Sequence, residues 1–187
     1  RPEKGKVVEV TLVAERATME VAPGDKREVW TFNGQVPAPV IRVHQGDTLR
    51  ITLQNKDPEM DHGLDFHAGQ MDMGTFHAPI KPGESETFEF KANYPGLFYY
   101  HCSANPVIAH IANGMFGAVI VDPPEYTPSG KEFVVIQNEW YKAGADIQEL
   151  TEGSPVAAAL NGVASQYIDH PLQATAGENM RFYFVNA

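Results

Sequence analysis

Short segments that alternate apolar and polar residues recur along the first two thirds of the chain. They are rich in β-branched and aromatic side chains and comprise Val7–Val13, Glu28–Phe32, Thr48–Leu53, Glu86–Phe90, Leu97–His101 and Ala118–Val121. Alternation with this composition is typical of β-strands. Proline and glycine turns separate the segments, and no long segment with a helical period lies among them. The pattern predicts an all-β fold, an antiparallel sandwich or barrel.

A stretch rich in proline and polar residues, Asp122–Gly130, divides the chain. It predicts a first domain over residues 1–123, a linker over 124–131 and a second domain over 132–187. The second domain opens with a further predicted strand, Glu132–Gln137.

The second domain repeats part of the first. The segment that begins at Trp30 resembles the one that begins at Ala158: WTFNGQVPAPVIRVHQGDTLRITLQN and AALNGVASQYIDHPLQATAGENMRFYFVN. Both contain an Asn-Gly turn, a strand, a glycine before an acidic residue, and a strand that ends in Asn, so the second domain is predicted to be another copy of the first fold.

The second copy is predicted to be incomplete. A long stretch follows Asn55 in the first copy, whereas only Ala187 follows Asn186. An incomplete sandwich exposes a sheet edge and its own core. We therefore expect one complete domain plus the first part of a second, with further chain or a partner polypeptide supplying the rest.

Acidic residues outnumber basic ones, with 24 Asp and Glu against 14 Lys and Arg among 187 residues, a net charge of -10 at pH 7. This balance argues against nucleic acid, because few cations are available to neutralise phosphates. It suits a basic protein partner, and equally a role in solubility. No apolar run approaches the roughly 20 residues of a membrane span, and no basic-then-apolar signal opens the chain. We expect a soluble protein whose export signal has been removed.

The strongest chemical signal surrounds Cys102, the only cysteine, which excludes an intrachain disulfide. It precedes His110 and Met115 in the stretch HCSANPVIAHIANGM. One thiolate, two imidazoles and a weak axial thioether suit an electron-transfer copper, and His62 in HGLDFH is the candidate for the second imidazole. The alternative is that Cys102 and Met115 are simply core residues. Their joint spacing after an aromatic strand favours the metal site.

Side-chain alternation indicates a second site. Neighbours on a strand point to opposite faces, so if Cys102 points into the sandwich, His101 points out of it. The same parity separates His62 from Asp65 and His67 in an extended segment. Two imidazoles and a carboxylate on an outer face would form an incomplete metal site, although solvated surface histidines are the alternative.

Other histidines and methionines give weaker signals. His44, His77 and His170 have no partner at ligand spacing. Met71 and Met73 could contact a soft metal, but a gap-filling role is favoured.

Four motifs together resemble copper-containing nitrite reductases, in particular the subgroup with a short loop between the copper-binding Cys and His. They are HGLDFH, YYHC, PVIAHIANGM and IQNEWY, and the resemblance runs from about Val29 to the C-terminus. It implies a two-domain cupredoxin architecture, in which each domain is a Greek-key β-sandwich.

The resemblance also implies a role for each matched residue. The type 1, electron-transfer copper is matched by four residues: His62, Cys102, His110 and Met115. The type 2 copper is matched by His67 and His101, and the catalytic aspartate by Asp65. In the family, a third type 2 histidine and a second catalytic histidine come from the latter part of the second domain, across a trimer interface. That part has no counterpart in this sequence.

The function that the resemblance implies is the reduction of nitrite to nitric oxide and water. An electron would pass from type 1 to type 2 copper through the Cys102–His101 peptide while Asp65 relays protons, so activity should rise as pH falls. The expected partners are nitrite, an electron donor (a small cupredoxin or a cytochrome c) and two further copies in a homotrimer. The expected location is the periplasm or the outer face of the cell membrane, in denitrification or nitrate assimilation.

Two other functions fit part of the sequence. A single-copper electron carrier needs only the type 1 ligands and leaves His67, His101 and the second domain unexplained. A laccase-like multicopper oxidase needs paired His-x-His segments and a His-Cys-His sequence, but Ser103 follows Cys102. Copper content would separate the three functions.

Overall fold

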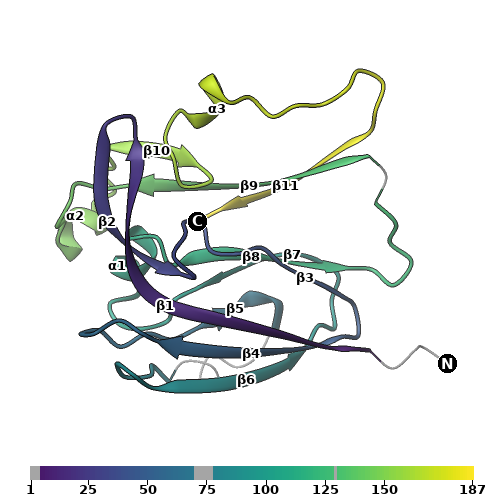
Figure 1. Ribbon diagram of the computed structural model, residues 1–187, viewed down its shortest axis with the longest axis horizontal. Helices are drawn as coiled ribbons and strands as arrows, with labels where there is room; N and C mark the ends of the chain where they lie inside the picture. The colour runs from purple at the N-terminus through teal and green to yellow at the C-terminus, as the bar shows by residue number, and fades with distance from the viewer. Residues whose placement is uncertain (1–4, 70–77, 129) are drawn as a thin grey trace.

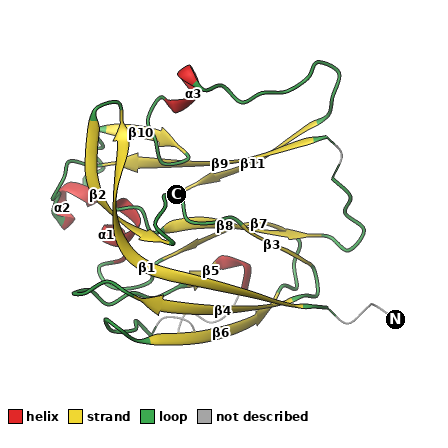
Figure 2. Ribbon diagram, viewed as in Figure 1, coloured by secondary structure: helices red, strands yellow, loops and turns green. Residues whose placement is uncertain are grey.

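Strands dominate residues 5–69, 78–128 and 130–187, the part of the chain that the computed structural model describes (Figures 1 and 2). The first sheet has the order β2-β1-β4-β6, formed by Asp25–Phe32, Val7–Ala22, Thr48–Asn55 and Ser85–Lys91. The second has the order β3-β8-β7-β5, formed by Ile41–His44, Phe116–Asp122, Gly96–His101 and Asp65–Phe66. The third has the order β10-β9-β11, formed by Ala157–Leu160, Lys131–Trp140 and Met180–Asn186. The predicted all-β class is confirmed.

The first two sheets form a sandwich around one hydrophobic core. Alternate residues of β4 are buried, so that Leu49, Ile51 and Leu53 have no exposed surface. They belong to the same buried cluster as Tyr100 of β7 and Val119 of β8. Each such side chain stabilises the fold by about 1.5–3 kcal/mol through removal of apolar surface from water.

The third sheet covers the outer face of the second, and strand β8 is therefore buried along its whole length (Figure 1). Phe116 and Ala118 of β8 belong to a second buried cluster with Ile136 of β9 and Val185 of β11. The next β8 side chain, Val119, faces the sandwich core instead. This burial on both faces explains the nearly continuous apolar sequence of β8.

Strand β1 links the sandwich to the third sheet. Its first half, Val7–Ala14, pairs with β4 in parallel, and its second half, Ala14–Ala22, pairs with β2 in antiparallel fashion. The hairpin thus reaches the third sheet (Figure 1), and Ala164 N, in the turn after β10, donates to Val21 O at 2.8 Å.

The two sequence repeats adopt the same local structure. Asn33 and Asn161 both have left-handed backbones, with φ of 59° and 54°. Asn33 Oδ1 accepts from Val13 N at 2.6 Å, and Asn161 Oδ1 accepts from Ile136 N at 2.8 Å. Each asparagine amide also donates to the carbonyl two residues earlier on the same strand. β1 pairs with β4, and β9 with β11, in parallel.

The helices are short: η1 His67–Gly69, α1 Val107–Ala112, α2 Ile147–Thr151 and α3 Gln166–Asp169. In the described segments, none of the helices has the length and apolar character that crossing a membrane requires. Met71, Met73 and His77, which the sequence analysis considered, lie outside the described residues.

Candidate metal centres

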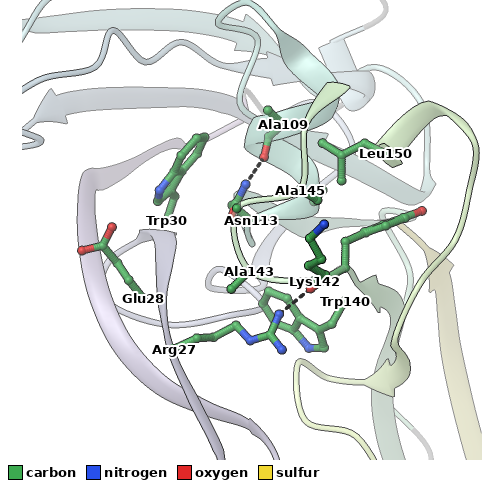
Figure 3. Close-up of a pocket in the computed structure, with 13 residues that line it drawn as sticks. Arg27, Glu28, Trp30, Ala109, Asn113, Trp140, Lys142, Ala143, Ala145 and Leu150 are labelled. Carbon is green, nitrogen blue, oxygen red and sulfur yellow. Dashed lines mark hydrogen bonds between the residues drawn. The ribbon is translucent and has the colours of Figure 1, made fainter. Parts of the chain in front are cut away.

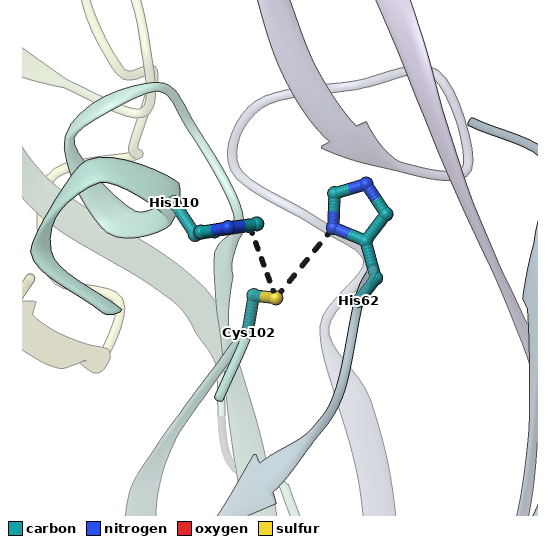
Figure 4. A group of neighbouring side chains, drawn as sticks. All are labelled: His62, Cys102 and His110. Carbon is teal, nitrogen blue, oxygen red and sulfur yellow. Dashed lines mark hydrogen bonds between the residues drawn. The ribbon is translucent and has the colours of Figure 1, made fainter. Parts of the chain in front are cut away.

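Three buried donor atoms converge at one end of the sandwich (Figure 4). Cys102 Sγ lies 3.3 Å from His110 Nδ1 and 3.6 Å from His62 Nδ1. The two imidazole rings are nearly perpendicular, at 82°. His62 comes from an isolated bridge to Ile80, Cys102 directly follows β7, and His110 lies on α1.

Met115 is tied to the same site by its backbone. Met115 N donates to His110 O at 3.1 Å, and Cys102 N donates to Met115 O at 3.0 Å. The Met115 side chain is fully buried. We call His62, Cys102, His110 and Met115 the soft group, because sulfur and imidazole donors predominate.

A glycine allows the chain to approach the thiol. Gly63 N donates to Cys102 Sγ at 3.5 Å. A Cβ atom at Gly63 would lie only 2.3 Å from Ser103 Oγ, so a larger residue would force the side chain of Ser103, the residue after Cys102, to move.

Burial keeps the soft group neutral when no metal is bound. It raises the pKa of Cys102 to about 11. It lowers the pKa of His62, and burial together with repulsion from His62 lowers that of His110 to about 4. Neutral imidazoles are the ligating form, and a metal cation would stabilise the thiolate that burial disfavours. A thiolate, two imidazoles and a thioether fit copper.

A second group of donors lies on the outer side of the second sheet and consists of Asp65, His67 and His101, which we call the outer group. His67 Nε2 lies 3.3 Å from His101 Nε2. Asp65 Oδ2 is 3.7 Å from His67 Nε2 and 3.6 Å from His101 Nε2. Nitrogen and oxygen donors of this kind suit a divalent transition metal.

Neighbouring strands and backbone orient the outer group. Asp65 of β5 pairs directly with His101 of β7. His101 Nδ1 lies 2.9 Å from Cys102 O and can donate to it, which leaves Nε2 for a ligand. The side chain of His67 is 49% exposed and that of His101 11%, so solvent reaches the group from the His67 side.

The structure thus places Asp65, His67 and His101 together, apart from the soft group. His101 and Cys102 diverge as alternation predicts, but His67 lies on η1, and strand parity does not account for its position. His44 is exposed beside Asp47, and exposed His170 caps α3; neither joins a donor cluster among residues 5–69, 78–128 and 130–187.

Sequence reasoning missed two neighbours of the soft group, Trp30 and Asp57. The Trp30 ring packs edge-on against His110, with centroids 5.0 Å apart. Trp30 also lines a hollow of about 350 Å³ together with Ala109, Asn113 and Trp140 (Figure 3). The apolar position of Trp30 in a strand signalled only core packing.

Asp57 contacts His62 from its other side, with Oδ2 3.5 Å from Nε2. Burial opposes its ionisation, but hydrogen bonds from Arg16 and from the Glu59 and Met60 amides outweigh that effect and hold the pKa of Asp57 well below its usual range. The only sequence signal was an Asp in a loop after a strand, which is common in turns.

Comparison with known proteins finds copper proteins among the relatives of this chain. The multicopper oxidase family matches residues 13–126. A copper-containing nitrite reductase of Neisseria gonorrhoeae is 39% identical over 96% of this chain and 49% of its own length. The chain therefore spans about half the length of this curated relative.

Solved structures that superpose on this chain include a copper nitrite reductase and a laccase. A copper nitrite reductase of Nitrosomonas europaea superposes with a TM-score of 0.90 and 39% identity, over 97% of this chain and 68% of the other. A laccase of Botrytis aclada, at 23% identity and a TM-score of 0.78 over 98% of this chain and 38% of its own, shares the fold alone.

Proposed function

Because the chain belongs to the copper-containing nitrite reductases, within the multicopper oxidase family and its cupredoxin fold, we propose that it serves the reduction of nitrite to nitric oxide. Nitrite takes up one electron and two protons, and one of its oxygens leaves as water. One observation carries the proposal: Cys102 belongs to the soft group and its neighbour His101 to the outer group. A site that accepts an electron is thereby joined to a site that can bind a substrate.

Each group has donors suited to copper. When bound, copper supplies one-electron redox chemistry at the soft group and Lewis-acid activation of nitrite at the outer group. Cys102 and His101 connect the groups through one peptide bond, which the hydrogen bond between His101 Nδ1 and Cys102 O reinforces. The backbone thus fixes both the distance and the orientation of the two donors.

Asp65 is the residue proposed to handle protons. Its carboxylate lies within 4 Å of both outer histidines, and its side chain is 20% exposed. It can therefore exchange protons with water and deliver them to a substrate held between His67 and His101. A partly exposed carboxylate beside the substrate position suits a reaction that consumes two protons.

The outer group has only two imidazoles, and we propose that a third comes from a further segment of the protein, across the interface of a homotrimer. The third sheet supports the expectation of further strands. Met180, Phe182 and Phe184 of β11 expose 52%, 53% and 57% of their surface on one face. Further strands of a complete second cupredoxin domain would cover this apolar face.

The electron donor is proposed to be a small cupredoxin or a cytochrome c that approaches the soft group. The hollow beside Trp30 supports this direction, because Trp30 lines the hollow (Figure 3) and also packs against His110 of the soft group. The net charge of -10 favours a basic donor. We place the protein in the periplasm or on the outer face of the cell membrane, in denitrification or nitrate assimilation.

The test is to load the protein with copper, supply a reduced donor, and measure nitrite consumed and nitric oxide formed. Equal amounts of the two would support the proposal. Copper content separates the alternatives, since an electron carrier holds copper at the soft group alone and a laccase-like enzyme holds additional copper ions. Copper binding at both the soft group and the outer group without any nitric oxide would contradict the proposed activity.

A further inference from the structure

The ring nitrogen of His62 that points away from Cys102 faces a buried carboxylate. His62 Nε2 lies 3.5 Å from Asp57 Oδ2, and neither side chain is more than 1% exposed. Within the described residues Nε2 makes no hydrogen bond. At this distance the carboxylate acts on the imidazole as a nearby fixed charge, which a buried, weakly polar surrounding screens poorly.

Four N–H groups hold the Asp57 carboxylate in place. Arg16 donates from Nε to Oδ2 at 2.8 Å and from Nη2 to Oδ1 at 3.1 Å. The backbone amides of Glu59 and Met60 donate to Oδ1 at 2.8 and 3.0 Å. Oδ1 is therefore largely occupied by the loop, and Oδ2 is the oxygen presented to His62.

This arrangement selects one form of the imidazole. His62 Nδ1 faces Cys102 Sγ at 3.6 Å, so Nδ1 is the nitrogen available to a metal and the proton of the neutral ring resides on Nε2. A carboxylate on the Nε2 side stabilises this tautomer and ring orientation, as carboxylates behind metal-bound histidines do. His110 instead has the Trp30 ring packed against it.

We propose that Asp57, held by Arg16, is a positioning residue that lowers the reduction potential of copper bound at the soft group. A fixed negative charge close to a ligand favours the oxidised, more highly charged metal. A lower potential makes the reduced site a stronger donor to the outer group. The inference rests on the copper site of the proposed function but not on nitrite as the substrate.

The main test is Asp57→Asn in the copper-loaded protein, with the potential measured by redox titration of the visible band. The variant keeps the shape and an acceptor oxygen but removes the charge. We expect the band to remain, the potential to shift upward, and copper(II) affinity in competition with a chelator to fall by about 10- to 100-fold. Asp57→Glu, which restores a carboxylate, should return the potential toward the wild-type value.

Asp122 offers a matched control, because it is also buried and bidentate with an arginine. Arg42 donates to its two oxygens at 2.6 and 3.0 Å. Asp122 belongs to neither donor group. Asp122→Asn should lower the stability of the fold while leaving the potential and the copper affinity at wild-type values.

Two results would overturn the proposal: an unchanged potential in Asp57→Asn, or the same upward shift in Asp122→Asn, which would indicate general loosening of the fold. If Asp57→Asn does not fold, Arg16→Gln carries the test, since it leaves the carboxylate charge uncompensated and should lower the potential. An unchanged or raised potential in that variant overturns the proposal. Absence of the visible band from the wild-type protein would instead contradict the copper site, and with it the proposed function.

Discussion

At the scale of single residues, adjacent side chains serve two different environments. Cys102 is fully buried in the sandwich core, whereas His101 lies on the opposite face of the second sheet with Asp65 and His67. Strand geometry imposes this separation, because successive side chains point to opposite faces. A single residue change can therefore affect one group and leave the other in place.

Cys102→Ala should abolish the visible absorption of the copper-loaded protein, because the thiolate is the charge-transfer donor. The sheets should remain, since the core contains many other buried side chains, and the unfolding transition should stay cooperative. Absorption spectra and far-ultraviolet circular dichroism measure the two effects. A variant that keeps the visible band would remove Cys102 from the soft group.

In the proposed homotrimer, Asp65→Asn should reduce nitrite turnover by about a hundredfold or more, the scale of a positioned acid–base group, while copper stays bound at both groups. Asp65→Ala should act in the same way. Turnover at saturating donor and copper content are the measurements, with Asp61→Asn, an exposed acid on the same segment, as the control. Normal turnover in both Asp65 variants would contradict its proton-handling role.

At the scale of elements, the same Asn-Gly turn occurs once in each repeat, at Asn33 and at Asn161. Asn161 forms hydrogen bonds to Ile136 N, Val134 O and the Tyr167 hydroxyl. Gly162, the next residue, approaches Val36 O so closely that a Cβ atom would lie 2.2 Å from it. The second repeat is therefore both internally bonded and packed directly against the first.

Asn161→Gly should destabilise the protein by about 1–3 kcal/mol, because it leaves partly buried backbone groups without their partner. Glycine accepts the left-handed backbone of this position, so the change isolates the side-chain hydrogen bonds from backbone strain. Chemical denaturation measures the loss. Gly24, which has a similar backbone and open space around it, provides a control site for Gly→Asn. A loss well below this range would show that solvent replaces the three hydrogen bonds.

At the scale of the whole molecule, Arg42 links the sandwich to the third sheet. It pairs with Asp122 at the end of β8 and with Glu132 of β9, at 2.6 and 2.5 Å. Its guanidinium also lies 5.7 Å from the centre of the Tyr183 ring on β11. The guanidinium of Arg42 therefore contacts strands of both the second and the third sheet.

The pH dependence of stability should report this link. The hydrogen bonds from Arg42 lower the pKa of Glu132 to about 2 from its usual 4.5. A depressed pKa in the folded state gives a contribution that is present above about pH 4.5 and is lost as pH falls toward 2. The difference between the denaturation midpoints of wild-type and Glu132→Gln proteins should be full at pH 7 and should shrink progressively as pH falls from about 4.5 toward 2. A difference that is independent of pH would show that Glu132 does not act through its charge.

The presence of only two imidazoles in the outer group leads to a prediction about assembly. Expressed by itself, the 187-residue chain should hold copper at the soft group, because all four donors are present, but should hold it poorly at the outer group and form little nitric oxide. Copper content and nitric oxide formation check this. Full occupancy of the outer group with normal turnover would show that Asp65, His67 and His101 suffice without a histidine from elsewhere.

The sequence by itself determined the fold class and the chemistry of the donors. Alternation and turn residues identify a strand chain, because the β period is local and side-chain burial follows it directly. The spacing of Cys102, His110 and Met115 within one short loop defined the soft ligands, since few other roles require a thiol, an imidazole and a thioether so close together. The Asn-Gly turns indicated the repeat, because the left-handed backbone at Asn33 and Asn161 is one that few residue types adopt.

Only the tertiary structure decided what depends on contacts between segments distant in sequence. It placed His67 on a short 3-10 helix beside His101, paired Asp65 with His101 across two strands, and put Trp30 against His110. It also brought Arg16 of β1 to Asp57, 41 residues later, and through it to His62. No local pattern specifies such pairs, because they depend on the order of strands in the sheets and on which loops converge at one end of the sandwich.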